Sequence, residues 1–280
     1  MNVLGRIFSW EEIEQGKIPK LESFTEIANI IRKDLLPNEK VEAALLCGSV
    51  LREDFSLRSD VDCIVIYNDI AVISDLRRLI TIAKTEFVPV EMIPIDVRMV
   101  EAGIHTLSGS FLQHLQRAAK EGGTIKGDLL SILKIAENDP REKLKETFGI
   151  VSQKLNRALC ELSRFEKEKR IFNLGKILEA PVEIVRSIVW AKRLSIVNES
   201  KGEVLRAYWT IADKRSKNLL EKVLEVGEEY SAVLEKVLQL SDPVPYKEEY
   251  TEILGRIEEL GQNEILEFIV HNAQLINQTI

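Results

Sequence analysis

Two hydrophobic periods alternate along the first half of the chain. Short runs rich in β-branched residues predict strands, and stretches with apolar residues three or four positions apart predict amphipathic helices. The expected strands are VEAALLCG (41–48), VDCIVIYN (61–68) and FVPVEMIPI (87–95), and the expected helices cover 23–36, 73–87 and 109–122. This mixture is typical of an α/β or α+β domain.

Beyond Asp139-Pro140 the strand-like runs disappear. Apolar residues recur at helical spacing through segments 144–165, 180–197, 204–226, 230–240, 249–260 and 264–278, which predicts a helical bundle. Pro181 suits the first turn of a helix, Gly202 and Gly227 suit helix ends, and SDPVPY (241–246) is a break before the last two helices. We therefore expect an α+β domain at residues 1–139 and an all-α helical domain at 140–280.

Length and composition are those of a globular protein. A chain of 280 residues with 45% hydrophobic content buries a substantial core, and two domains are favoured. It has no apolar run of 18 residues and no signal-peptide pattern at its start, so we expect a cytoplasmic protein without a membrane partner. Cys47, Cys63 and Cys160 are far apart in apolar sequence, which favours buried thiols over a disulfide or a zinc site.

The charge of the chain restricts its partners. A net charge of −7 argues against an extended nucleic-acid-binding surface, because such a surface needs many Lys and Arg contacts to phosphates. Residues 1–140 hold 16 Lys and Arg against 22 Asp and Glu, so the acidity lies in the first half.

Candidate chemistry is concentrated in LLCGSVLREDFSLRSDVDCIVIY (45–67). Asp60 and Asp62 stand at the start of an expected strand, so their carboxylates point to the same face, about 7 Å apart along the chain. Two carboxylates held so close favour a cation, and Mg²⁺ binds carboxylate oxygens together with water and substrate phosphates. Gly48 permits a tight turn, and Ser49 offers a hydroxyl and backbone N–H groups at an expected helix start, where an anion is favoured.

Gly48-Ser49, followed at a fixed interval by SDVD (59–62) on the next strand, resembles the signature of the polymerase-β-like nucleotidyltransferase superfamily. The resemblance covers roughly the first half of the chain. It implies a nucleotidyltransferase core with a small mixed sheet flanked by helices. It also implies that Asp60 and Asp62 bind two Mg²⁺ ions and that Gly48 and Ser49 bind a nucleoside triphosphate.

The resemblance also implies a third carboxylate from a neighbouring strand. Glu91, in VPVEM, looks like the corresponding strand of small archaeal-type and aminoglycoside-modifying members, whereas Asp96, in PIDVRM, looks like the polymerase version. Five positions apart, the two face opposite ways on a regular strand, so only one can be the ligand. Pro94 removes a ladder donor and suggests that the paired strand ends near it. This favours Glu91 as the third catalytic and metal-binding residue, with Asp96 as the alternative.

Arg52 and Ser59 complete the expected nucleotide-binding set, each beside a structural alternative. Arg52 is a candidate phosphate contact, although arginines beside acids are usually solvated ion pairs. A Ser-Asp pair at a strand start, as at Ser59, is also a common turn or cap device. Glu53 stands where family members often have Gly. EGGTIKGD (121–128) resembles the segment that closes the core in several members, and its Gly-Gly is equally an ordinary helix stop.

Together these residues predict Mg²⁺-dependent transfer of a nucleotidyl group from a nucleoside triphosphate to a hydroxyl, with release of pyrophosphate. The acceptor, a small molecule or a macromolecule, is not identified by any motif in the helical half. A core followed by a helical bundle resembles aminoglycoside nucleotidyltransferases. A homodimer is one possible assembly of the chain. The alternative is a nucleotide-binding regulator or antitoxin-like protein that acts on a protein partner through the helical half.

Overall fold

The computed structural model describes residues 5–52, 55–104, 107, 109–135, 140–162, 167–192, 201–240 and 242–279. The chain forms two compact units, Ile18–Asn138 and Met1–Lys17 together with Asp139–Ile280. The boundary between the two units lies between Asn138 and Asp139. It is one residue from the domain boundary that the hydrophobic pattern predicts between Asp139 and Pro140. The segment up to Lys17, which that pattern leaves in the first domain, groups instead with the helices.

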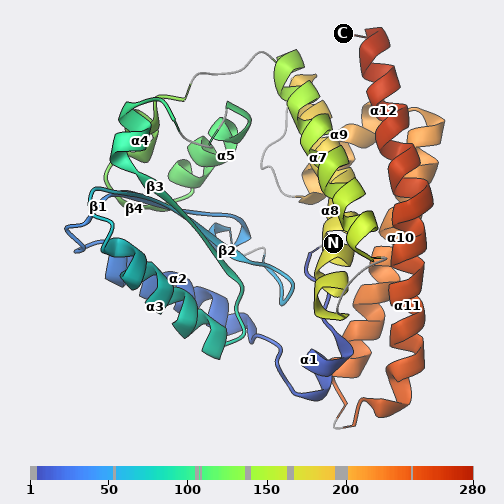
Figure 1. Cartoon of the computed structure of the whole chain (residues 1–280). Helices are drawn as coiled ribbons and strands as arrows, with labels where there is room; N and C mark the ends of the chain where they lie inside the picture. Colours follow the sequence, from blue (N-terminus) through green and yellow to red (C-terminus); the bar gives the residue numbers. More distant parts are fainter. Residues whose placement is uncertain are drawn as a thin grey trace. The chain divides into compact units, whose positions relative to one another are not determined.

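The unit Ile18–Asn138 is built on a four-stranded mixed sheet with strand order β3-β2-β1-β4 (Figure 1). The strands are β1 (Val41–Cys47), β2 (Val61–Tyr67), β3 (Val90–Asp96) and β4 (Thr124–Lys126). β1 is antiparallel to both β2 and β4, and β2 is parallel to β3. The expected α+β class with a small mixed sheet is therefore confirmed.

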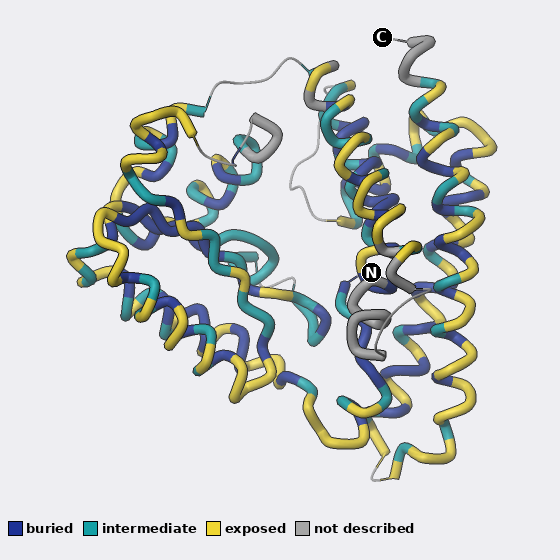
Figure 2. Tube along the Cα trace, viewed as in Figure 1, coloured by how far each residue is buried: buried dark blue, intermediate teal, exposed yellow. Residues whose placement is uncertain are grey.

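Helices cover both faces of this sheet because each strand alternates its buried side chains between two cores. On one face, α2 (Leu21–Leu35) and α3 (Val72–Thr85) pack against strand residues such as Val61 and Cys63. On the other, α4 (Val97–Glu101), α5 (Gly109–Lys120) and α6 (Leu129–Leu133) pack against residues such as Ile64. Burial on both faces gives the central strands their continuous apolar runs, which Figure 2 shows as buried.

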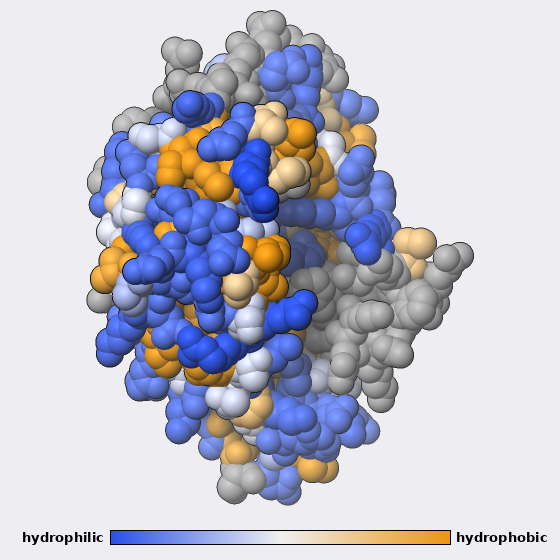
Figure 3. All heavy atoms as spheres, turned by 60° about the vertical axis from the view of Figure 1, so that its left-hand side comes forward, coloured by the Kyte–Doolittle hydropathy of each residue, from blue (hydrophilic) through white to orange (hydrophobic). Residues whose placement is uncertain are grey.

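The surface of the molecule in Figure 3 is mainly hydrophilic, with separate groups of hydrophobic residues. Among the described residues no helix combines the length and the apolar character needed to cross a membrane.

In the second unit, every regular element that the structure describes is a helix. Its elements are α1 (Trp10–Glu14), α7 (Pro140–Leu162), α8 (Lys167–Ala191), α9 (Lys201–Ile211), α10 (Lys214–Leu238), η2 (Val244–Tyr246), α11 (Lys247–Leu260), η3 (Gly261–Ile265) and α12 (Leu266–Thr279). The short segment before α1 is fixed to α10 and α11, because the backbone of Phe8 bonds to the hydroxyls of Tyr230 and Tyr250. These contacts explain why the N-terminal residues belong to the helical unit.

Three helix boundaries expected from the sequence are wrong. Pro181 lies inside α8, Gly227 lies inside α10, and Gly202 is the second residue of α9. α8 buries apolar residues on both sides of Pro181, including Ile177 and Ile184. Proline inside a helix costs about 3 kcal/mol, and fully burying one such side chain contributes about 1.5–3 kcal/mol, so several buried residues outweigh it.

Two helix junctions also differ from the hydrophobic pattern. The run 204–226 is divided between α9 and α10, and Asp213 begins α10 by accepting a hydrogen bond from the Ser216 N–H at 2.8 Å. The last two expected helices are joined through a π-helical turn at Gly261–Ile265. A Cβ on Gly261 would lie 2.6 Å from Cγ2 of Ile177, so the close approach of α8 requires glycine there.

Candidate functional site

The turn after β1 brings Gly48 against the carboxylate of Asp62. Gly48 has φ 89° and ψ −166°, a conformation that side-chain-bearing residues rarely adopt. A Cβ added to it would lie 3.5 Å from Oδ2 of Asp62. Cys47, the last residue of β1, is the antiparallel partner of Asp62. Glycine therefore lets the chain leave β1 directly beside this carboxylate.

Ser49 begins η1 (Ser49–Leu51), a 3₁₀ helix of three residues. The helix start expected at this position is confirmed, but the helix is a single 3₁₀ turn. One turn of 3₁₀ helix carries little of the dipole that favours an anion at the start of a longer helix. What the turn offers a ligand is therefore local: the Ser49 hydroxyl and the backbone groups beside Gly48.

The parallel ladder between β2 and β3 places Glu91 directly beside Asp62. Neighbouring strands lie about 4.8 Å apart, and residues paired in this way point to the same face. That face is the one covered by α4, α5 and α6, because Ile64 and Ile95 share the alternation of this pair and belong to that core. Asp62 is half-buried and Glu91 is exposed. Two acidic residues on adjacent strands are thus paired at the edge of the core.

Asp60 and Ser59 lie in the loop that precedes β2. Asp60 is exposed and stands immediately before the first strand residue, Val61. The hydroxyl of Ser59 accepts a hydrogen bond from the Ser56 N–H at 3.0 Å, and the Ser59 N–H donates to the Ser56 carbonyl at 3.0 Å. Ser59 therefore orders the loop that carries Asp60. Glu53, the position that departs from the family pattern, lies outside the described residues.

In the described part of the chain, no three His, Cys, Asp or Glu side chains are grouped so that they could hold a metal ion. The donor chemistry nevertheless fits Mg²⁺, since Asp62 and Glu91 offer carboxylates from paired positions and Asp60 lies in the loop that leads into β2. Mg²⁺ commonly uses one or two carboxylates and keeps water and substrate phosphates as its other ligands. The protein residues would supply only part of its coordination.

Asp96 occupies the opposite end of β3, where its partner on β2 is Tyr67. Five residues of strand separate it from Glu91, about 16 Å. Asp96 begins α4: its Oδ1 accepts the Arg98 N–H at 2.9 Å, and the Arg98 guanidinium bonds to both carboxylate oxygens. Those hydrogen bonds from Arg98 lower the pKa of Asp96 to about 2. Asp96 therefore caps a helix away from Asp62.

The strand was expected to end near Pro94, and the pairing of β3 ends two residues beyond it, at Asp96. Pro94 is the partner of Val65, and the ladder continues to Asp96. Proline is tolerated because β3 lies at the edge of the sheet, where an N–H facing away from β2 has no partner strand. Glu91 lies beside Asp62 because of the register between β2 and β3, and Pro94 does not contribute to this placement.

Arg52 links the Gly48 turn to the end of α5. Its Nη1 lies 3.3 Å from the Gly48 carbonyl and 3.3 Å from Oε2 of Glu121. Glu121 also lies 3.6 Å, through Oε1, from Nε of Arg117. The sequence did not identify Arg117 and Glu121, because 69 residues separate Arg52 from Glu121. The only signal was the segment 121–128, which stops α5 and then forms β4.

The thiol of Cys47 adjoins these charges. Burial is the main cause that raises its pKa to about 12; the negative charge of Asp62 acts in the same direction, and the positive charge of Arg117 opposes the shift. The thiol therefore stays protonated at neutral pH and is a poor nucleophile.

No family model matches the chain, and no curated protein matches it. The resemblance to nucleotidyltransferases therefore rests on the sequence motif alone.

Proposed function

We propose that the unit Ile18–Asn138 transfers a nucleotidyl group from a nucleoside triphosphate to a hydroxyl acceptor and releases pyrophosphate, with Mg²⁺ as cofactor. The observation that carries the proposal is the pairing of Asp62 with Glu91 on adjacent strands, beside the turn at Gly48. A turn or cap device would account for the Ser-Asp sequence alone. It does not require a second carboxylate in register on the next strand.

The proposed reaction needs metal binding, phosphate binding and proton transfer, and Glu91 takes part in the first and the last. Asp62, Asp60 and Glu91 would hold Mg²⁺, which supplies charge neutralisation for the triphosphate. The Gly48 backbone and the Ser49 hydroxyl bind phosphate oxygens, and Glu91, exposed on the edge strand, accepts the proton of the acceptor hydroxyl. The acceptor oxygen forms a bond to the α-phosphorus as the bond from that phosphorus to the bridging oxygen breaks, and pyrophosphate leaves.

The test compares two carboxylates on the same strand. Glu91→Gln keeps the shape of the side chain and removes its charge and basicity, so turnover should fall by two or more orders of magnitude, roughly the contribution of a general base. Asp96→Asn removes the same charge at the far end of β3 and should leave turnover within about threefold of wild type. The assay follows transfer of an α-³²P-labelled nucleotide to pooled hydroxylated acceptors and to cell lysate, with Mg²⁺.

The Asp60→Asn/Asp62→Asn double variant is the second arm. It should retain the circular dichroism spectrum of the wild type and lose Mg²⁺-dependent labelling. Equal turnover in Glu91→Gln and wild type would remove Glu91 from the reaction. Absence of label on every small molecule and protein, with wild-type protein and all four nucleoside triphosphates, would refute the proposed activity.

A further inference from the structure

Two arginines from different elements share one carboxylate behind the Gly48 turn. Arg52 follows η1, Arg117 lies in the last turn of α5, and Glu121 directly follows that helix end. Glu121 contacts Arg52 through Oε2 at 3.3 Å and Arg117 through Oε1 at 3.6 Å. We call Arg52, Arg117 and Glu121 the arginine clamp.

We propose that the arginine clamp binds the β- and γ-phosphates of the nucleotide, with Arg52 and Arg117 as the contacting groups and Glu121 as the residue that positions them. The inference rests on the proposed function for the identity of the anion, a triphosphate. It assigns Arg117 and Glu121, which the motif does not contain.

Burial and charge support this assignment. The side chains of Arg52, Glu121 and Arg117 are 18%, 23% and 18% exposed, so their interactions are screened less than those of a surface ion pair. The two guanidinium groups are positively charged and attract phosphate oxygens. Guanidinium groups present paired donors that match phosphate oxygens, and holding them in place beforehand lowers the entropy cost of binding.

The position of the clamp matches the two ends of a metal-bound triphosphate. Arg52 bonds to the Gly48 carbonyl, and the Cα of the same glycine faces Oδ2 of Asp62. One glycine therefore has an arginine at its carbonyl and a carboxylate oxygen beside its Cα. A metal bound by the carboxylates and phosphates bound by the arginines would lie next to each other across the turn.

The clamp could instead be a purely structural link between α5 and the η1 turn, and binding measurements separate the two. The probe is inorganic tripolyphosphate, titrated calorimetrically into the full chain at fixed ionic strength. Arg117→Gln and Glu121→Gln should each weaken binding by about tenfold or more, because a charge-assisted contact is lost or misdirected. Glu121→Asp, which keeps the charge, should restore part of the affinity. Lys120→Gln, an equal charge change at an exposed neighbour, should change affinity by less than about twofold.

Three outcomes would overturn the clamp: no tripolyphosphate binding by the wild type, equal effects of Arg117→Gln and Lys120→Gln, or a loss of thermal stability in Glu121→Gln with unchanged affinity. A parallel turnover assay separates the clamp from the proposed function. Weakened tripolyphosphate binding in Arg117→Gln, without turnover of any nucleotide by the wild type, would support the clamp and refute the activity. Turnover by Arg117→Gln with a wild-type KM for the nucleotide would refute the clamp alone.

Discussion

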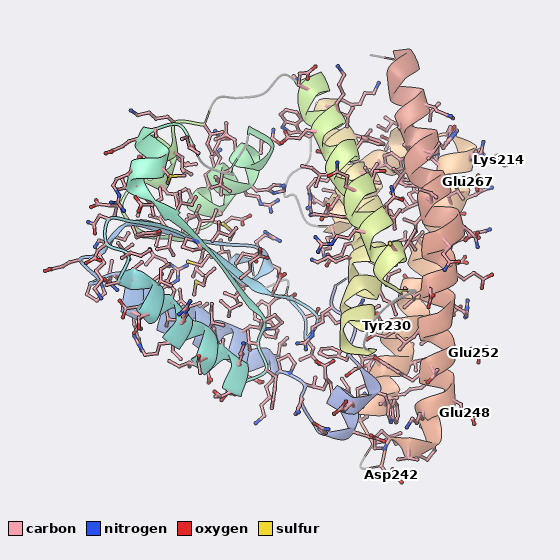
Figure 4. All side chains as sticks on the ribbon, in the orientation of Figure 1. Lys214, Tyr230, Asp242, Glu248, Glu252 and Glu267 are labelled. Carbon is pink, nitrogen blue, oxygen red and sulfur yellow. The ribbon has the colours of Figure 1, made fainter. Side chains whose placement is uncertain are left out.

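Removing one hydroxyl from the core of the helical unit should release the N-terminal segment. Tyr230, on α10 (Figure 4), accepts the backbone N–H of Phe8 at 3.0 Å and bonds to the Tyr250 hydroxyl at 2.9 Å. The Tyr250 hydroxyl donates to the Phe8 carbonyl at 2.8 Å. All three residues are 0% exposed. Two side chains thus satisfy both polar groups of one buried backbone unit.

The expected magnitude follows from these contacts. Tyr230→Phe keeps the ring, so no large cavity forms. It removes two hydrogen bonds worth about 1 kcal/mol each and leaves the buried Phe8 N–H without its acceptor, at a cost of about 1–3 kcal/mol. We expect the free energy of unfolding of the helical unit to fall by about 3–5 kcal/mol. Tyr250→Phe also removes two hydrogen bonds but leaves a carbonyl, which tolerates lost pairing better, so it should cost about 2 kcal/mol.

Urea denaturation followed by circular dichroism measures the change, and hydrogen exchange of the Phe8 amide reports it locally. Exchange should accelerate in Tyr230→Phe. Tyr246→Phe, a half-buried tyrosine in η2, is the matched control and should remain within about 0.5 kcal/mol of wild type. In a double-mutant cycle the effects of Tyr230→Phe and Tyr250→Phe should be non-additive, because the two hydroxyls share one network. A Tyr230→Phe variant with the stability and Phe8 exchange rate of the Tyr246→Phe control would refute the reasoning.

Two further predictions concern titration of single groups. Cys160 is exposed, so the expectation that it is a buried thiol is wrong. Because the pKa of the Cys47 thiol is raised to about 12, iodoacetamide at pH 8 should alkylate Cys47 far more slowly than Cys160. Mass spectrometry of the digested protein measures both rates, and equal rates would contradict the raised pKa of Cys47. The folded-state pKa of Asp96 is about 2, below its usual value of 3.8. The Asp96 carboxylate therefore stabilises the folded protein above about pH 4, and this stabilisation is lost as the pH falls to about 2. The unfolding midpoints of wild type and Asp96→Asn should therefore differ at neutral pH and converge near pH 2, and a constant difference across that range would count against the Arg98 contact.

Local sequence patterns predicted the elements of the sheet unit well. β1, β2, α2, α3 and α5 begin and end within about two residues of the expected ranges, because alternation and helical spacing are local properties. In the helical unit the same approach misplaced the boundaries at Pro181 and Gly227. Both residues lie inside helices whose apolar stripes are buried, and such tertiary burial cannot be derived from a local stop signal.

The candidate site shows the same division between local and long-range information. Gly48 and Asp62 were predicted as neighbours because a tight turn and a short interval separate them. Arg117 and Glu121 were not, since their approach to Arg52 depends on how α5 packs against β1. A motif contains only the residues that are close in sequence, and it misses partners supplied by other elements.

Register decides which acid on β3 stands beside Asp62, and packing fixes the register. To bring Asp96 to the position of Glu91, β3 would have to slide by five residues along β2. An odd shift moves every β3 side chain to the other face of the sheet. Ile95, buried among the α4, α5 and α6 residues, would then point to the α2 and α3 core, and Met92, which packs against that second core, would leave it. The two cores therefore exclude the shifted register, and the pairing of Glu91 with Asp62 is a consequence of how both faces of β3 are buried.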